Sequence, residues 1–292
     1  MGQSYDHYVS RAHMRQWATD NRVTVLRRDA ENPKPLDIGK AIAAEQGLNS
    51  PSIEAAYGRI ENAFARALPR LLDSFSTPTN LDWQAVRKYA VLVHDRYPAL
   101  RGSAVDENGL PGGNAMMVPN PAHWGGLSGV SDHLAHLATT MDREQLKAAR
   151  LQLLPVFAQS LPPMAQVFHV GPMLLGDAGI HAITLHPDDK TNRSCIAMPL
   201  SSNALVVFGN QSFENEDARE IEHVLRMKVA MESTVVVDTP DAPVIRGLVM
   251  QMWRYQPRPS GMGAPKAIHV WSRPEDIPDS RCDEGQSSIW TP

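Results

Sequence analysis

Apolar side chains recur at three- and four-residue steps in the first half of the chain, a pattern that predicts amphipathic helices. One run begins at Ser50-Pro51, where serine is a preferred N-cap and proline a preferred first helical residue. A second run follows the turn at 78–80, and a third follows Asp142 and ends before the prolines at 162–163. The expected apolar stripes are Ile53, Tyr57, Ile60, Phe64, Ala67, Leu71 and Phe75, then Val86, Ala90 and Val93, and finally Leu146, Ala149, Leu153 and Val156.

The second half contains short apolar segments separated by turn residues, which is typical of β-strands. We expect strands near residues 167–170, 180–185, 195–200, 204–208, 234–237 and 248–252, and an earlier one at 22–26. One helix interrupts them, because Ala218, Ile221, Leu225 and Val229 form an apolar stripe. Helices followed by strands predict an α+β fold, with a helical N-terminal half packed on a mainly antiparallel C-terminal sheet.

The same pattern predicts one domain followed by a tail. The parts are a domain at 1–256, divided into a helical part at 1–160 and a strand-rich part at 161–256, and a loosely ordered tail at 257–292. An insertion at 101–129 is too rich in Gly, Pro and Asn to form a long regular element. Because this segment is also partly apolar, we expect an ordered lid or an insertion and not a solvated linker, with Trp124 as a substrate contact.

Composition and charge describe an ordinary globular chain of 292 residues, long enough to bury a core without disulfides. The formal net charge of -4 argues against a generally basic nucleic-acid-binding protein, although it leaves room for a local basic groove. We find no signal peptide and no apolar run long enough to span a membrane, so we expect a cytoplasmic protein without membrane contact. Of the two cysteines, Cys195 lies in an apolar run and is expected to be buried and unreactive.

Two charged residues share helix faces with apolar residues. Glu61 lies one helical turn after Tyr57, and Arg96 continues the apolar stripe of the next helix. A charge on a core-facing stripe is costly unless it is paired, and consecutive helices joined by a short turn usually pack antiparallel. Two interpretations stay open. The residues form a structural ion pair, or they surround, with His7 and Arg15, a pocket that binds an anionic group.

Other polar residues give weaker signals. Asp177 ends an apolar strand, where a carboxylate serves either a site or only a turn. Asp6-His7 is like the start of a His-Asn-His nuclease motif, but the required second histidine does not follow. The Asp-His-x-x-His segment at 132–136 has metal-ligand spacing but is incomplete as a site. We therefore assign no metal ligands and identify no cofactor. Phosphate-binding loops, nucleophile elbows, zinc helices and dinucleotide fingerprints are all missing from the sequence.

The opening segment from His7 to Trp17 resembles a mostly bacterial family of proteins of unknown function, which begin with His-Tyr-Val-Pro-x-x-x-Leu-Arg-x-Phe. Here Ser10, Met14 and Trp17 replace the proline, leucine and phenylalanine. The later pieces that are similar to the family are the strand at 22–26, a helix with an internal glutamate, Arg96-Tyr97-Pro98, Leu174-Leu175-Gly176-Asp177 and Met198-Pro199-Leu200-Ser201. The resemblance covers roughly the first 240 residues. It implies a polar residue at Glu61 and at Arg96, and it names no reaction.

Two functions follow from these observations. The first is a hydrolase of the nuclease or phosphoesterase type that uses buried acidic and basic side chains of the N-terminal helices. Its catalytic candidates are Glu61, Arg96, His7 and Asp177, and its substrate-binding candidates are Arg15 and Trp124. The alternative is a non-catalytic binding or interaction protein in which these residues are structural. In both cases the expected partner is an anionic small molecule or a nucleic acid. The two functions differ in whether the candidates surround an open pocket or lie in the core.

Overall fold

The computed structural model describes part of the chain. The described residues are 9–27, 32–41, 50–96, 143–177, 179–185, 193–233, 235–240, 247, 249–250, 270–271 and 289–290. The predicted insertion at 101–129, most of the predicted tail, and the candidates His7 and Trp124 lie outside these residues.

Four long helices lie where the apolar pattern predicts them. They are α2 (Pro51–Leu72), α3 (Asn80–Asp95), α6 (Arg143–Ser160) and α7 (Asn215–Glu232). Thr79 and Asp82 form a capping box at the start of α3. Two short helical segments, α1 (Arg11–Met14) and η1 (Arg15–Trp17), precede them. None of the helices in the described part of the chain is both long and apolar enough to cross a membrane.

Two details of the predicted helices are wrong. Helix α2 ends at Leu72, so Phe75 lies beyond it, and its side chain is 97% exposed. In α6 the buried side chains include Leu154 and Phe157, whereas Val156, in the predicted stripe, is exposed. Leucines occur on both sides of α6, so the apolar period alone did not indicate which side would face α3.

Eight strands form two four-stranded sheets, and every neighbouring pair in them is antiparallel. The first has the order β3 (Met164–His169), β7 (Ala204–Gly209), β6 (Arg193–Ser201), β5 (His181–Leu185). The second has the order β2 (Lys34–Asp37), β1 (Arg22–Arg27), β8 (Val235–Asp238), β4 (Leu175–Gly176). A short parallel pair joins β9 (Val270–Trp271) to β10 (Ile289–Trp290). The fold is therefore α+β.

The second sheet departs from a simple order of helices followed by strands, because it combines two strands from each half of the chain. The predicted strand at 248–252 is also wrong. Gly247, Val249 and Met250 are helical. A short apolar run does not distinguish a strand from a buried helical turn, which explains the error.

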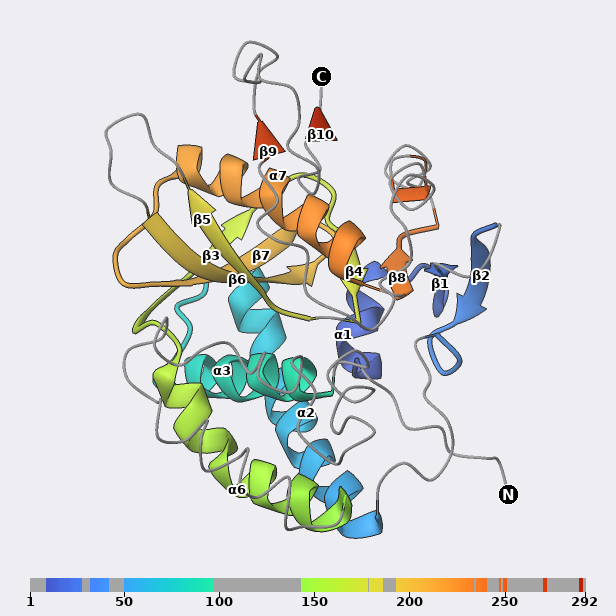
Figure 1. Ribbon diagram of the computed structural model, residues 1–292, viewed down its shortest axis with the longest axis vertical. Helices are drawn as coiled ribbons and strands as arrows, with labels where there is room; N and C mark the ends of the chain where they lie inside the picture. Colours follow the sequence, from blue (N-terminus) through green and yellow to red (C-terminus); the bar gives the residue numbers. More distant parts are fainter. Residues whose placement is uncertain are drawn as a thin grey trace, which may run out of the picture.

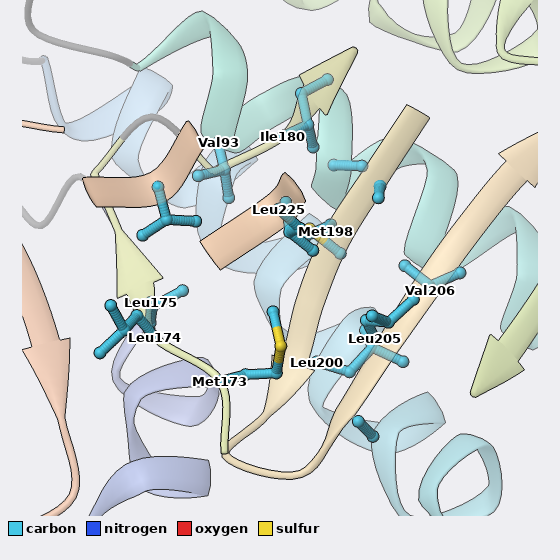
Figure 2. Close-up of a cluster of buried hydrophobic side chains, with 14 of the residues drawn as sticks. Val93, Met173, Leu174, Leu175, Ile180, Met198, Leu200, Leu205, Val206 and Leu225 are labelled. Carbon is cyan, nitrogen blue, oxygen red and sulfur yellow. The ribbon is translucent and has the colours of Figure 1, made fainter. Parts of the chain in front are cut away.

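The core lies on both faces of the first sheet. Helix α7 covers one face, while α2 and α3 lie on the other and α6 packs against α3 (Figure 1). Figure 2 shows Val93 of α3 and Leu225 of α7 in one cluster with Met198 of β6 and Val206 of β7. Because β6 and β7 are covered on both faces, they are continuous apolar runs rather than alternating ones. Cys195 lies in this core as predicted, and burial raises the pKa of its thiol to about 12.

Candidate functional site

Glu61 and Arg96, the two charged residues on apolar helix faces, form an ion pair. Arg96 is the C-cap of α3, and its Nη1 donates to Oε1 of Glu61 on α2. The guanidinium carbon lies 4.1 Å from the ring centroid of Tyr57, a cation–π distance. The side chain of Arg96 is 3% exposed and that of Glu61 is 25% exposed. The cation is therefore inside the core, and only the carboxylate reaches solvent.

A second polar cluster joins the opening segment to α3 and β6. A carbonyl only accepts, so His13 must carry its hydrogen on Nε2 and donate it to the carbonyl of Pro199, 2.8 Å away. The Nδ1 atom of the neutral ring then accepts from the hydroxyl of Tyr89 at 3.1 Å. The oxygen of Tyr89 in turn accepts from the backbone N–H of Ser10 at 3.2 Å and from its hydroxyl at 3.1 Å. Every ring nitrogen and hydroxyl in this cluster has a partner.

The surroundings keep this cluster uncharged. Burial lowers the pKa of His13 to about 4, although the hydrogen bond to the Pro199 carbonyl opposes the effect. Burial also raises the pKa of the Tyr89 hydroxyl, and the charge of the nearby Glu61 raises it further. The ring of Tyr89 stacks on Phe64 with centroids 3.8 Å apart. No atom of His13 is accessible to a ligand. The hydrogen bonds of this cluster therefore hold the opening segment against the core and do not form a binding site.

Asp177 lies in a tightly packed turn after β4 and is completely buried. A Cβ atom on Gly176 would lie 2.0 Å from Oγ of Ser233, at the end of α7. A Cβ atom on Gly179 would lie 2.2 Å from Cγ1 of Val93 on α3, and Gly179 also has a φ of +75°. The glycines beside Asp177 therefore allow α7 and α3 to approach this turn. Packing accounts for the two glycines of the Gly-Asp-x-Gly sequence.

A further pair was missed by sequence analysis. His181 on β5 contacts Glu232 on α7, with Nδ1 and Oε2 separated by 2.6 Å, and Lys228 donates to the other carboxylate oxygen at 3.1 Å. Burial alone would raise the pKa of Glu232, but His181 and Lys228 lower it to about 2. The available signal was a histidine at an inward position of a strand whose buried and exposed residues alternate.

Arg15 is part of a positively charged surface formed by the opening segment and the β1–β2 hairpin. We define the cationic surface as the five exposed side chains Arg11, Arg15, Arg22, Lys34 and Lys40. Residues 9–41 contain seven basic and four acidic residues, a net charge of +3 in a chain of net charge -4. None of the five side chains forms a salt bridge with another described residue.

The structure brings several of the predicted residues to one end of α3 and buries Arg96 and Asp177 there. Arg96 ends this helix, Glu61 pairs with it, and the turn of Asp177 contacts Val93 one turn earlier. Within the described part of the chain, no three His, Cys, Asp or Glu side chains gather in a way that would hold a metal ion. The predicted segment at 132–136 lies outside that part. The arrangement has the properties of a structural junction between α2, α3, α7 and the two sheets.

Comparison with known proteins gives one result. A family model described as a protein of unknown function (DUF4238) matches residues 5–150, which is half of the chain. The match includes the opening segment, Glu61 and Arg96, and it ends before Asp177. No curated protein and no solved structure matches the chain.

Proposed function

The chain belongs to the DUF4238 family, and we propose that it is a non-catalytic protein that binds an anionic partner through the cationic surface. The observation that carries this proposal is the local charge. Five exposed cations, without a salt bridge to any other described residue, lie within residues 9–41, whose net charge is +3. Such a surface attracts anions even when the whole protein is acidic, because the field near a surface depends on its nearest charges.

Arg11 links the cations of the opening segment to the hairpin. Arg11 and Arg15 are four residues apart on consecutive helical turns, so they are neighbours on that helical surface. The guanidinium carbon of Arg11 lies 3.8 Å from the position that a Cβ atom on Gly39 would occupy. This contact places Arg11 beside the residue that precedes Lys40. Arg11 therefore lies close to the end of the hairpin.

The burial of the catalytic candidates supports a structural role for them. Arg96 is 3% exposed and Asp177 is 0% exposed, so neither can touch a substrate without a large rearrangement of the core. Glu61 and Arg96 are already paired with each other in an ion pair. A buried cation needs such a counter-charge, and the carboxylate supplies it.

The experiment compares two variants that lose the same number of charges. Arg11→Gln/Arg15→Gln/Lys40→Gln removes three cations from the cationic surface, and Arg59→Gln/Arg66→Gln/Arg219→Gln removes three exposed cations from α2 and α7. The measurement is the salt concentration that elutes each purified protein from immobilised heparin. We expect a lower value than wild type for the first variant only. Equal shifts in both variants, or no retention of the wild-type protein, would overturn the proposal.

A hydrolase of the nuclease or phosphoesterase type is the second candidate. The observation that favours it is the 25% exposure of the Glu61 side chain, because a carboxylate beside a guanidinium and open to water is able to act as a general base. The assay is hydrolysis of a phosphodiester by wild type, by Glu61→Gln, and by Glu216→Gln as an exposed control on α7. Loss of turnover in Glu61→Gln alone supports this candidate. Absence of turnover in the wild-type protein would exclude the hydrolase.

A further inference from the structure

We infer that β3, an edge strand of the first sheet, is a dimerisation surface that pairs antiparallel with β3 of a second copy of this chain. The inference goes beyond the proposed function, because it concerns the other sheet and no residue of the cationic surface. In such a dimer the first sheets of the two copies join into one continuous sheet. The open backbone of β3, its unprotected sequence and the match of that sequence to itself support this partner.

The backbone of β3 has an open side. In the order β3-β7-β6-β5 only β7 is its neighbour, and all six residues of β3 pair with β7 in one register without a bulge (Figure 1). Every second residue of such an edge strand directs its N–H and C=O away from the sheet. Within the described part of the chain, no hydrogen bond reaches these outward groups. The edge therefore offers a row of donors and acceptors to another strand.

The other three edges of the two four-stranded sheets are protected against such pairing. Strand β2 carries Lys34 and Pro35, β4 is two residues long, and α7 packs against β5. Charges, prolines, very short strands and covering helices all protect a sheet edge. Strand β3, with the sequence Met-Ala-Gln-Val-Phe-His, contains no Lys, Arg, Asp, Glu or Pro. Among the described elements, only β7 makes extensive contact with it.

The side chains of β3 are accessible to a neighbouring strand. Met164 is 40% exposed, and Ala165, Gln166 and Val167 are half-buried. The amide of Gln166 is already bound within the chain, because its Nε2 donates to the carbonyl of Phe213 at 3.2 Å and its Oε1 accepts from the N–H of Phe213 at 2.8 Å. A second strand would cover apolar surface of Met164 and Val167, and this burial stabilises association.

The sequence of β3 matches a second copy of itself. A two-fold axis perpendicular to the sheet relates two identical edges in antiparallel orientation and keeps each face of the sheet on the same side. With the axis at Gln166, Met164 lies opposite Phe168 of the second copy, and Ala165 lies opposite Val167 of the second copy. Apolar side chains then meet apolar side chains, and no like charges are opposed. This match favours a homodimer over a strand from another protein.

The test compares two variants that place one lysine on equally exposed apolar positions. Met164→Lys lies on β3, and Val156→Lys lies on α6, where the wild-type valine is 41% exposed. The measurement is the molar mass by light scattering during size-exclusion chromatography at several protein concentrations. We expect wild type and Val156→Lys to form the same dimer. The dissociation constant of Met164→Lys should be at least about tenfold higher, because each dimer contains two Met164–Phe168 pairs.

Hydrogen exchange of the wild-type protein locates the contact without relying on the folding of a variant. Outward amides of β3 should exchange more slowly as the protein concentration rises, whereas those of β2, a protected edge, should not change. A wild-type protein that is monomeric at every concentration overturns the inference and leaves this edge to a segment of another protein. Equal effects of the two lysines, or exchange in β3 that does not depend on concentration, also overturn it. Retention on heparin tests the proposed function separately.

Discussion

His13 should make the stability of this protein depend on pH between about 4 and 6.5. Burial lowers the pKa of its ring to about 4, compared with 6.5 in an unfolded chain. Between these values the unfolded chain binds a proton that the folded chain excludes. Stability is therefore fully present above pH 6.5 and falls as the pH falls toward 4. The difference between the two pKa values corresponds to about 3 kcal/mol, of which about 2.5 kcal/mol is lost between about pH 7.5 and pH 4.5.

The assay is urea unfolding of wild type and His13→Gln at several pH values in this range. Glutamine keeps an N–H donor for the Pro199 carbonyl but does not titrate, so the variant should be less stable at neutral pH and much less sensitive to acid. The pH range also avoids the low-pKa carboxyl of Glu232, whose contribution to stability is lost only as the pH falls below about 4.5 toward 2. Equal losses of stability in both proteins between about pH 7.5 and pH 4.5 would refute the reasoning.

Three other substitutions test the packing of the fold by thermal and urea unfolding. Gly176→Ala should destabilise the protein by at least about 1–3 kcal/mol, because its Cβ would overlap Ser233. The control Gly58→Ala lies in open space on α2 and should stabilise it by about 0.5–1 kcal/mol; equal effects of both would contradict the close approach. Tyr89→Phe leaves the His13 ring nitrogen without its donor and should cost about 1–3 kcal/mol, so a neutral result would argue against that network. Phe75→Ser should change stability by less than about 0.5 kcal/mol, because Phe75 is 97% exposed, and a larger loss would reveal a contact.

The helices of the core were predictable because their apolar stripes are long and regular. The stripe of α2 from Ile53 to Leu71 and that of α7 from Ala218 to Val229 are largely buried as the period requires. The long strands β6 and β7 were predictable for a related reason, since their continuous apolar runs are bounded by turns. The arrangement of the second sheet was not predictable, because its central pair, β1 with β8, joins residues more than 200 positions apart. No local pattern specifies such a pairing.

The candidate site was only partly predictable. A charge on an apolar helix face indicated that Glu61 and Arg96 needed partners, and the structure pairs them with each other. The sequence did not indicate how deeply Arg96 would be buried, because burial depends on α2, the Tyr57 ring and the surrounding core together. From the sequence alone, His13 was assigned no role beyond its place in the opening segment. Its partners Tyr89 and Pro199 are 76 and 186 positions away, so only the fold reveals its role.

The cationic surface illustrates a different limit. Its charges are visible in the sequence, but the net charge of -4 conceals them. Their importance becomes clear only when the structure shows which cations are exposed and which, such as Arg96 and Arg193, pair with carboxylates. Predicting the charge of a local surface therefore requires the positions of the counter-charges as well as the number of charged residues.

The central claim is that Glu61 and Arg96 stabilise the fold, while the ligand binds elsewhere. The most direct test is a double-mutant cycle of Glu61→Gln and Arg96→Met, measured by urea unfolding. Glu61→Gln leaves a buried guanidinium without its counter-charge, so we expect a loss of about 3 kcal/mol. The double variant should lose much less than the sum of the two single variants. A Glu61→Gln protein as stable as wild type, or more stable, would contradict the account, because it would identify the pair as a functional site maintained at a cost in stability.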